Sequence, residues 1–222
     1  MSTSSFEEEA VMEMDVLRYI GAVTREIQNR DYEGRPARVL VATCAYDTSV
    51  DDVWDAVTNA ERIPKWFLPV SGDLRLGGSY QLHGNASGKI TGCEPPRSLE
   101  LTWEFGGQVS WVQVRLTALS DGGTRLRLEH IAHVPDELWN QYGPGAVGVG
   151  WDLAMMGLVK HLATGSAVDP KQAAAWTASE EGKDFIRQSS EEWGRASISA
   201  GTDEAAARSA AGRTTAFYTG QS

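Results

Sequence analysis

Apolar residues recur along the chain in three patterns, and each pattern predicts a different kind of structure. Within residues 1–35 they follow helical spacing, which predicts an N-terminal helix with one apolar stripe. Residues 36–165 hold the alternating runs and most of the turn signals, as is typical of strands. Residues 166–222 are rich in alanine and poor in β-branched residues, so we expect a C-terminal extension of two or three helices.

Capping and breaking residues mark where these helices begin and end. Gly34 and Pro36 are expected to end the N-terminal helix, because glycine suits a helix C-cap and proline cannot continue the hydrogen-bond ladder. In the extension, Asp169 before a proline and Thr202 before an acidic first turn are the expected N-caps.

The middle segment has an α+β order of elements. A first strand at 38–46 is followed by two short helices, at 50–57 and at 59–69, the second broken by a proline. A run of strands and a long helix complete the order: strands at 78–83, 88–93, 99–105, 110–119 and 124–133, and a helix at 145–162. This order predicts a curved antiparallel sheet that buries one face beneath the long helix.

Alternation within the strands predicts which side chains face that core. Leu99, Leu101 and Trp103 alternate with polar neighbours, and His130 falls on the same inward face of its own strand. Trp111 alternates out of phase and should lie on the convex side. Because an indole exposed there is unfavourable, we expect the N-terminal helix, the extension or a second subunit to cover it.

A set of short motifs within residues 38–164 resembles a known family, the activator-of-heat-shock-ATPase-homologue branch of the SRPBCC, or START-like, superfamily. The motifs are VWDA (53–56), KWFLP (65–69), LGG (76–78), CEPPRSL (93–99), TW (102–103), GTRL (123–126) and GW (150–151). The resemblance implies a helix-grip fold, in which a seven-stranded antiparallel sheet wraps around a long C-terminal helix with a cavity between them. It does not extend to the N-terminal helix or to the extension.

The resemblance implies a cavity but no particular reaction. Relatives bind lipids, hormones or polyketides, some cyclise or hydrolyse their substrates, and one eukaryotic group stimulates a chaperone ATPase. Since one fold hosts all these functions, the function has to be argued from the site.

Aromatic residues give the strongest indication of a ligand site. The family fold would place seven of them at the walls or rim of the cavity, and with one histidine they form the candidate ligand-binding set: Trp66, Phe67, Tyr80, Trp103, His130, Trp139, Tyr142 and Trp151. Aromatic walls with few polar anchors are typical of a pocket for an apolar ligand. The alternative is that these rings simply fill the core.

His130 has two interpretations. In an apolar cavity it would serve as a ligand anchor or a general base; otherwise it is a core histidine bonded to a backbone carbonyl.

His130 and His133 point to opposite faces of a strand, so we expect no metal site, and no cofactor is indicated. Cys44 and Cys93 are each expected to be buried, unreactive thiols.

The glycines at 143–148 match the letters G-x-G-x-x-G but lack the strand and the βαβ unit of a dinucleotide site. We therefore expect them to let the long helix start tightly against the sheet.

Composition narrows the classes of partner. The 222 residues include 20 basic and 30 acidic side chains, and a net charge of −10 argues against binding to nucleic acid. No apolar run approaches the ~20 residues that cross a membrane, and the acidic start is unlike a signal peptide. We expect a soluble, cytoplasmic protein without membrane contact.

The leading interpretation is a module that binds a small apolar or amphipathic ligand. One alternative is an enzyme of the cyclase, lyase or hydrolase kind that uses His130 or a loop residue as acid or base. The other is a protein-interaction role in which the extension makes the contact. A homodimer is a further expectation, because the extra helices add apolar surface.

Overall fold

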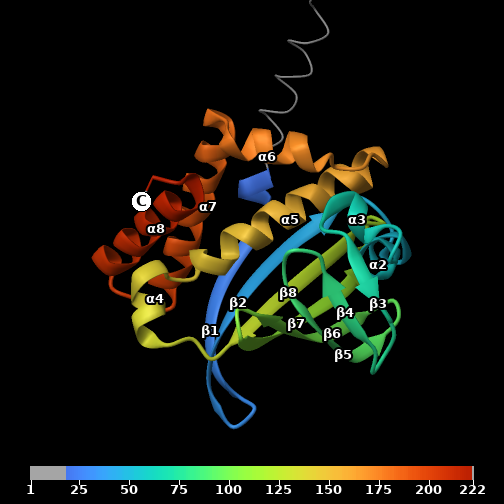
Figure 1. Cartoon of the computed structure of the whole chain (residues 1–222), viewed down its shortest axis with the longest axis horizontal. Helices are drawn as coiled ribbons and strands as arrows, with labels where there is room; N and C mark the ends of the chain where they lie inside the picture. The colour runs from blue at the N-terminus through green and yellow to red at the C-terminus, as the bar shows by residue number, and fades with distance from the viewer. Residues whose placement is uncertain (1–18, 222) are drawn as a thin grey trace, which may run out of the picture.

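The computed structural model describes residues 19–221. Its strands form one antiparallel sheet in the order β1-β2-β8-β7-β6-β5-β4-β3, curved and not closed (Figure 1). The strands are β1 (Thr24–Tyr32), β2 (Arg35–Tyr46), β3 (Val70–Gly72), β4 (Ser79–Leu82), β5 (Ser87–Glu94), β6 (Ser98–Phe105), β7 (Gln108–Ala118) and β8 (Thr124–Ala132). The helices are α2 (Val50–Thr58), α3 (Ile63–Trp66), α4 (Asp136–Tyr142), α5 (Gly145–Thr164), α6 (Pro170–Ala178), α7 (Glu180–Ser199) and α8 (Glu204–Thr219). The predicted α+β helix-grip fold is confirmed, with α5 as the gripped helix.

The alternation predicted for the strands places the core correctly. Leu99, Val112 and Leu128 are buried on the concave face beneath α5, and His130 lies on that face too, 7% exposed. Phe105 follows the same alternation but is 58% exposed, because it is the last residue of β6 before the Gly106–Gly107 turn. The concave face and the apolar face of α5 therefore form the main core.

The prediction of a helix up to residue 35 is wrong for its second half. Only residues 19–22 are helical, and β1 then pairs along its whole length with β2, from Thr24 opposite Thr43 to Tyr32 opposite Arg35. Glu33 and Gly34, both with positive φ, form the two-residue turn between them, so Gly34 makes a hairpin rather than a helix end. The part of the predicted helix before residue 19 lies outside the described residues.

The extension packs against the domain instead of hanging free. Helices α6 to α8 lie on one side of α5, while α2 and α3 lie on the other (Figure 1). Helix α7 contacts both α5 and β1, and its Phe185, Ile186 and Trp193 are completely buried. Asp169 caps α6 as predicted, but Asp203 rather than Thr202 caps α8, by accepting a hydrogen bond from Ala206 N.

The first glycines of α5 serve the extension and not the sheet, which corrects the expectation for residues 143–148. A Cβ atom added at Gly145 would lie 3.0 Å from Thr214 of α8, and one at Gly148 would lie 2.4 Å from the Trp193 indole of α7. The missing side chains therefore allow α7 and α8 to approach the long helix closely.

Among residues 19–221, strand and loop residues rather than a helix or the extension pack against Trp111. Its ring lies 4.9 Å from the ring of Tyr32 and 5.3 Å from that of His133, measured between centroids, and it is half-buried. It packs over a small second core of Ala37, Val39, Val41 and Ile131 on the convex face. The expected N-terminal helix is therefore not what contacts Trp111 among the described residues; Tyr32 of strand β1 does.

No helix among the described residues has the length and apolar character needed to span a bilayer.

Candidate functional site

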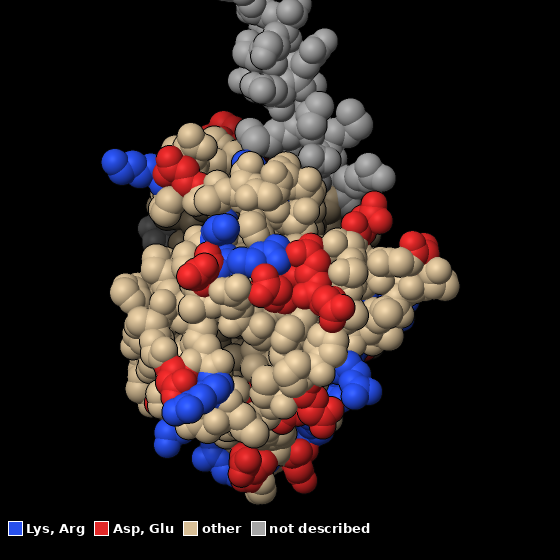
Figure 2. Space-filling model, turned by 90° about the vertical axis from the view of Figure 1, so that its right-hand side faces the viewer, with Lys and Arg blue, Asp and Glu red and all other residues tan. Residues whose placement is uncertain are grey.

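An apolar cavity lies between the concave face of the sheet and α5, with α2 and α3 beside it. Its volume is about 140 Å³. Figure 2 views the molecule from the side of α2, α3 and the short strands, where charged side chains form a band among many uncharged residues. The cavity is lined by Val57, Thr58, Ile63, Trp66, Phe67, Leu74, Tyr80, Leu82, Ile90, Cys93, Leu99, Leu101, Trp103, Val112, Val114, Leu126, Leu128, Trp151, Ala154, Met155 and Leu158.

Four polar side-chain groups of this lining are engaged elsewhere in the fold. Trp66 Nε1 donates to Ala56 O at 2.8 Å, Tyr80 Oη to Thr102 O at 2.8 Å, Thr58 Oγ1 to Trp54 O at 2.7 Å, and Trp151 Nε1 to His130 Nδ1 at 3.0 Å. Because a committed donor gains nothing by turning inward, these four groups add little polarity to the wall of the cavity.

Aromatic rings form a continuous wall at one end of the cavity. The centroids of Trp103 and Trp151 are 5.1 Å apart, those of Phe67 and Trp151 are 6.3 Å apart, and Trp66 stacks on Phe67 at 5.4 Å. These separations are typical of favourable aromatic contacts. Five of the eight candidate residues, Trp66, Phe67, Tyr80, Trp103 and Trp151, therefore lie around one space.

His130 stands behind this wall and is not among the lining residues. Its Nδ1 accepts the Trp151 indole hydrogen, so Nε2 carries the proton and donates to Ser110 Oγ at 2.9 Å. Ser110 Oγ donates in turn to Trp103 O at 3.1 Å. Burial lowers the pKa of His130 to about 4, which keeps the imidazole neutral. The histidine thus orients the Trp151 indole directly and is linked through Ser110 to the backbone of Trp103.

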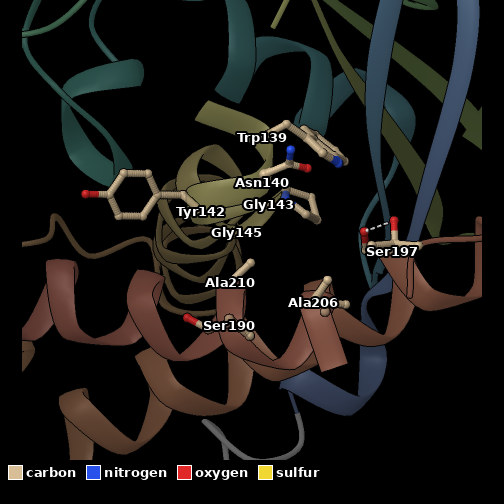
Figure 3. Close-up of a pocket in the computed structure, with 14 residues that line it drawn as sticks. Trp139, Asn140, Tyr142, Gly143, Gly145, Ser190, Ser197, Ala206 and Ala210 are labelled. Atoms are coloured by element: carbon tan, nitrogen blue, oxygen red, sulfur yellow. Dashed lines mark hydrogen bonds between the residues drawn. The ribbon is translucent and has the colours of Figure 1, made fainter. Parts of the chain in front are cut away.

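Trp139 and Tyr142 lie at a different place, the end of the molecule where α4 meets α8. Trp139 stacks under the guanidinium of Arg38, 4.3 Å from it, and the ring of Tyr142 lies 5.7 Å from that of Phe217. The hollow beside them has a volume of about 20 Å³, roughly the space of one water molecule. Figure 3 shows Tyr142 and Ser197 on opposite sides of this hollow, with the Tyr142 ring directed away from Ser197.

Sequence reasoning missed the aliphatic part of the cavity. Ile63, Met155 and Leu158 come from α3 and α5. In the sequence, each of them is only an apolar position on one face of a helix. Cys93 is half-buried and lines the cavity, whereas Cys44 is buried and its pKa is raised to about 11 by burial. Nothing in local spacing separates a lining position from a core position.

A curved antiparallel sheet that grips a long helix over an apolar cavity is the helix-grip arrangement of the SRPBCC superfamily. The model of the family described as "Activator of Hsp90 ATPase homolog 1-like protein" matches residues 47–163, more than half of the chain. The chain belongs to this family, and the predicted family membership is confirmed. Proteins of this fold bind hydrophobic ligands.

Solved structures agree with this assignment. The crystal structure of CalU16 from Micromonospora echinospora is 34% identical, covers 80% of this chain and 97% of its own, and has a TM-score of 0.61. Its solution NMR structure is 35% identical over 82% of this chain and 97% of its own, with a TM-score of 0.66. DynU16, from the dynemicin biosynthetic locus, is 23% identical over 58% of this chain and 48% of its own; its TM-score of 0.53 shows the fold alone. No curated protein matches the chain.

Proposed function

We propose that the protein binds a small apolar ligand, or the apolar part of an amphipathic one, in the cavity between the sheet and α5. The observation that supports this most directly is the cavity lining, in which aliphatic and aromatic side chains surround the space and four polar groups are bonded elsewhere. Such a site selects its ligand by shape and by removal of apolar surface from water.

The volume of the cavity limits what fits inside it. An engineered apolar cavity of about 150 Å³ in another protein stays dry and binds benzene. At about 140 Å³, this cavity accommodates a guest of the size of one aromatic ring without rearrangement. A larger ligand has to leave its remaining atoms outside the cavity or displace the rings of Phe67 and Trp103.

The geometry gives less support to an enzyme. His130 has both ring nitrogens engaged and is separated from the cavity by Trp103 and Trp151. Among the described residues that line the cavity, none is an acid, a histidine or a lysine. A general acid or base needs to reach the reacting atoms, and the titratable side chains among these described lining residues are Tyr80, whose hydroxyl is bonded to Thr102 O, and Cys93.

A chaperone-activating role that uses the extension also has less support, since the large apolar residues Phe185, Ile186 and Trp193 are buried within the chain. The homodimer and the cytoplasmic location remain predictions.

Quenching of tryptophan fluorescence by iodobenzene tests the proposal, because three tryptophans line the cavity and iodine quenches at short range. We expect saturable quenching in the natural protein and its loss in Ala154→Leu, which adds volume inside the cavity. Ala205→Leu makes the same change at an exposed position of α8 and should behave like the natural protein. Quenching that rises without saturation, and equally in all three proteins, would refute binding in the cavity.

A further inference from the structure

A second buried region, on the opposite side of α5 from the cavity, is built around an ion pair. Arg25 Nε donates to Asp152 Oδ2 at 3.0 Å, and the two side chains are 3% and 0% exposed. Asp152 Oδ2 also accepts from Ser189 Oγ at 2.5 Å and from Trp193 Nε1 at 3.1 Å. One carboxylate oxygen thus joins β1, α5 and α7.

Several polar atoms of the same region have no partner. Within the described part of the chain, Asp152 Oδ1, Arg25 Nη2, Tyr19 Oη and Tyr46 Oη are buried and make no hydrogen bond. An unpaired buried polar group costs ~1–3 kcal/mol, and the total stability of a domain is only ~5–15 kcal/mol. Four such groups left unpaired would remove most of that stability, so they need a partner.

The four groups belong to the same part of the protein interior. Arg25 lies opposite Ala42 on β2, and Cys44 and Tyr46 follow along the same face of that strand. The pKa of Tyr19 is raised, mainly by burial and further by the charge of Asp152 and by Tyr46, while Arg25 opposes the shift. Tyr19 and Tyr46 belong to the same core cluster, so the two hydroxyls and the ion pair share one buried region.

We propose that this region is a binding site for an uncharged, water-sized guest, namely a small cluster of ordered water that touches both tyrosine hydroxyls, Arg25 Nη2 and Asp152 Oδ1. We refer to it as the Asp152 site.

Charge and hydrogen-bonding capacity decide the class of guest. Arg25 and Asp152 neutralise each other, so a bound ion would be an uncompensated charge in a region without solvent. The free atoms offer both donors and acceptors: Arg25 Nη2 only donates, Asp152 Oδ1 only accepts, and the two hydroxyls do both. Water bonds to three groups on average when buried and serves as donor and acceptor at once, which matches this set.

The Asp152 site gives the extension a role in holding α5. Trp151, the neighbouring residue, is bonded on the cavity side to His130, and Asp152 is bonded on the other side to Ser189 and Trp193 of α7. Two consecutive residues therefore fasten the long helix on both of its flanks.

A double-mutant cycle on the two hydroxyls tests the site. If water bridges them, Tyr19→Phe and Tyr46→Phe should each raise the unfolding equilibrium constant about fivefold. In the double variant, the increase in this constant should be clearly smaller than the product of the two single increases. The control is Tyr218→Phe, whose hydroxyl donates directly to Ala146 O at 3.0 Å; combined with Tyr19→Phe it should give the full product. A single variant that is more stable than the natural protein, or a Tyr19/Tyr46 pair that multiplies fully, overturns the proposal.

A crystal structure of the full chain at high resolution, grown with bromide, provides a measurement that needs no variant. Density for a water molecule within hydrogen-bond distance of at least two of the four atoms supports the Asp152 site. An anomalous bromide peak there, or direct bonds among the four groups that leave no room for water, overturns it.

Discussion

At the scale of single residues, the Trp151–His130–Ser110–Trp103 series shows how one neutral imidazole links a cavity-lining ring on α5 to the backbone of β6. Every donor in the series meets an acceptor, and the last acceptor is a backbone carbonyl. Protonation of His130 would give Nδ1 a hydrogen directed at the Trp151 indole hydrogen, which breaks the first bond. The stability of the protein should therefore depend on pH in a range that this residue defines.

The first prediction is that stability falls as the pH is lowered from about 6.5 to about 4. The unfolded chain takes up a proton on His130 near pH 6.5, whereas burial holds the folded-state pKa at about 4, so acid favours unfolding within this window. The loss attributable to His130 is ~3 kcal/mol over the whole window. Urea unfolding at several pH values measures it.

His130→Gln is the informative variant, because its amide both donates and accepts but does not titrate. It should lose less stability than the natural protein over the same pH range. His83→Gln, at an exposed histidine, should leave the pH dependence unchanged. An identical acid response in all three proteins would show that His130 does not control it.

Residue-level prediction from sequence succeeded where alternation alone decides the outcome. The period of two placed Trp103 and His130 on the inward face, and the structure agrees. The same period could not reveal that His130 bonds to Trp151, 21 residues away on a helix, nor that Trp139 lies near α8 beside Arg38. Those partners depend on how elements pack, which local spacing does not encode.

At the scale of elements, α5 carries contacts on both flanks, and its glycines determine how closely α7 and α8 approach. Gly148 lies against the Trp193 indole, where an added Cβ would be 2.4 Å away, and Gly157 lies against Trp66 O at the same distance. The sequence favours contact of the first glycines with the sheet, because no pattern in it indicates where the extension packs.

The second prediction compares two glycine-to-alanine changes in helices. Gly148→Ala should destabilise the protein by ~1–3 kcal/mol, since the ring of Trp193 is buried and has to move. Gly212→Ala, on α8 with nothing within 4 Å, should instead stabilise it by ~0.5–1 kcal/mol through helix propensity. Chemical denaturation measures the free energy of unfolding of both variants. Equal changes in the two variants would mean that Gly148 is not in close contact with the Trp193 indole.

The misprediction of β1 has a clear physical cause. Val23 and Ile27 are four residues apart, which fits one face of a helix, and the strand that β1 pairs with begins only after the Glu33–Gly34 turn. Arg25 and Ile27 also fit one face of a strand. Residues 24–32 are too polar for their own spacing to decide between helix and strand. They form a strand because they pair with the edge of β2.

At the scale of the whole molecule, the extension completes the hydrophobic core. Phe185 and Trp193 belong to the main core cluster together with Leu40 and Trp151, and Asp152 bonds to both Arg25 and α7. From sequence, residues 166–222 form a separate segment, since the family resemblance stops before them. Their burial argues that they fold with the rest.

The third prediction is that the chain unfolds in one cooperative transition. Scanning calorimetry should give a single peak, and circular dichroism and tryptophan fluorescence should report the same midpoint. A chain truncated after Gly165 should lose the stable fold, because the apolar faces of α5 and β1 that α7 covers become exposed. A truncated chain with an unchanged midpoint would show that the extension is independent.

The most direct test of ligand binding is a crystal structure of the protein soaked with iodobenzene, with the iodine located by its anomalous signal. The account predicts a peak inside the cavity, between the aromatic wall of Trp103 and Trp151 and the aliphatic side chain of Leu158. Peaks confined to the outer surface, with the cavity closed by its own side chains, would contradict it.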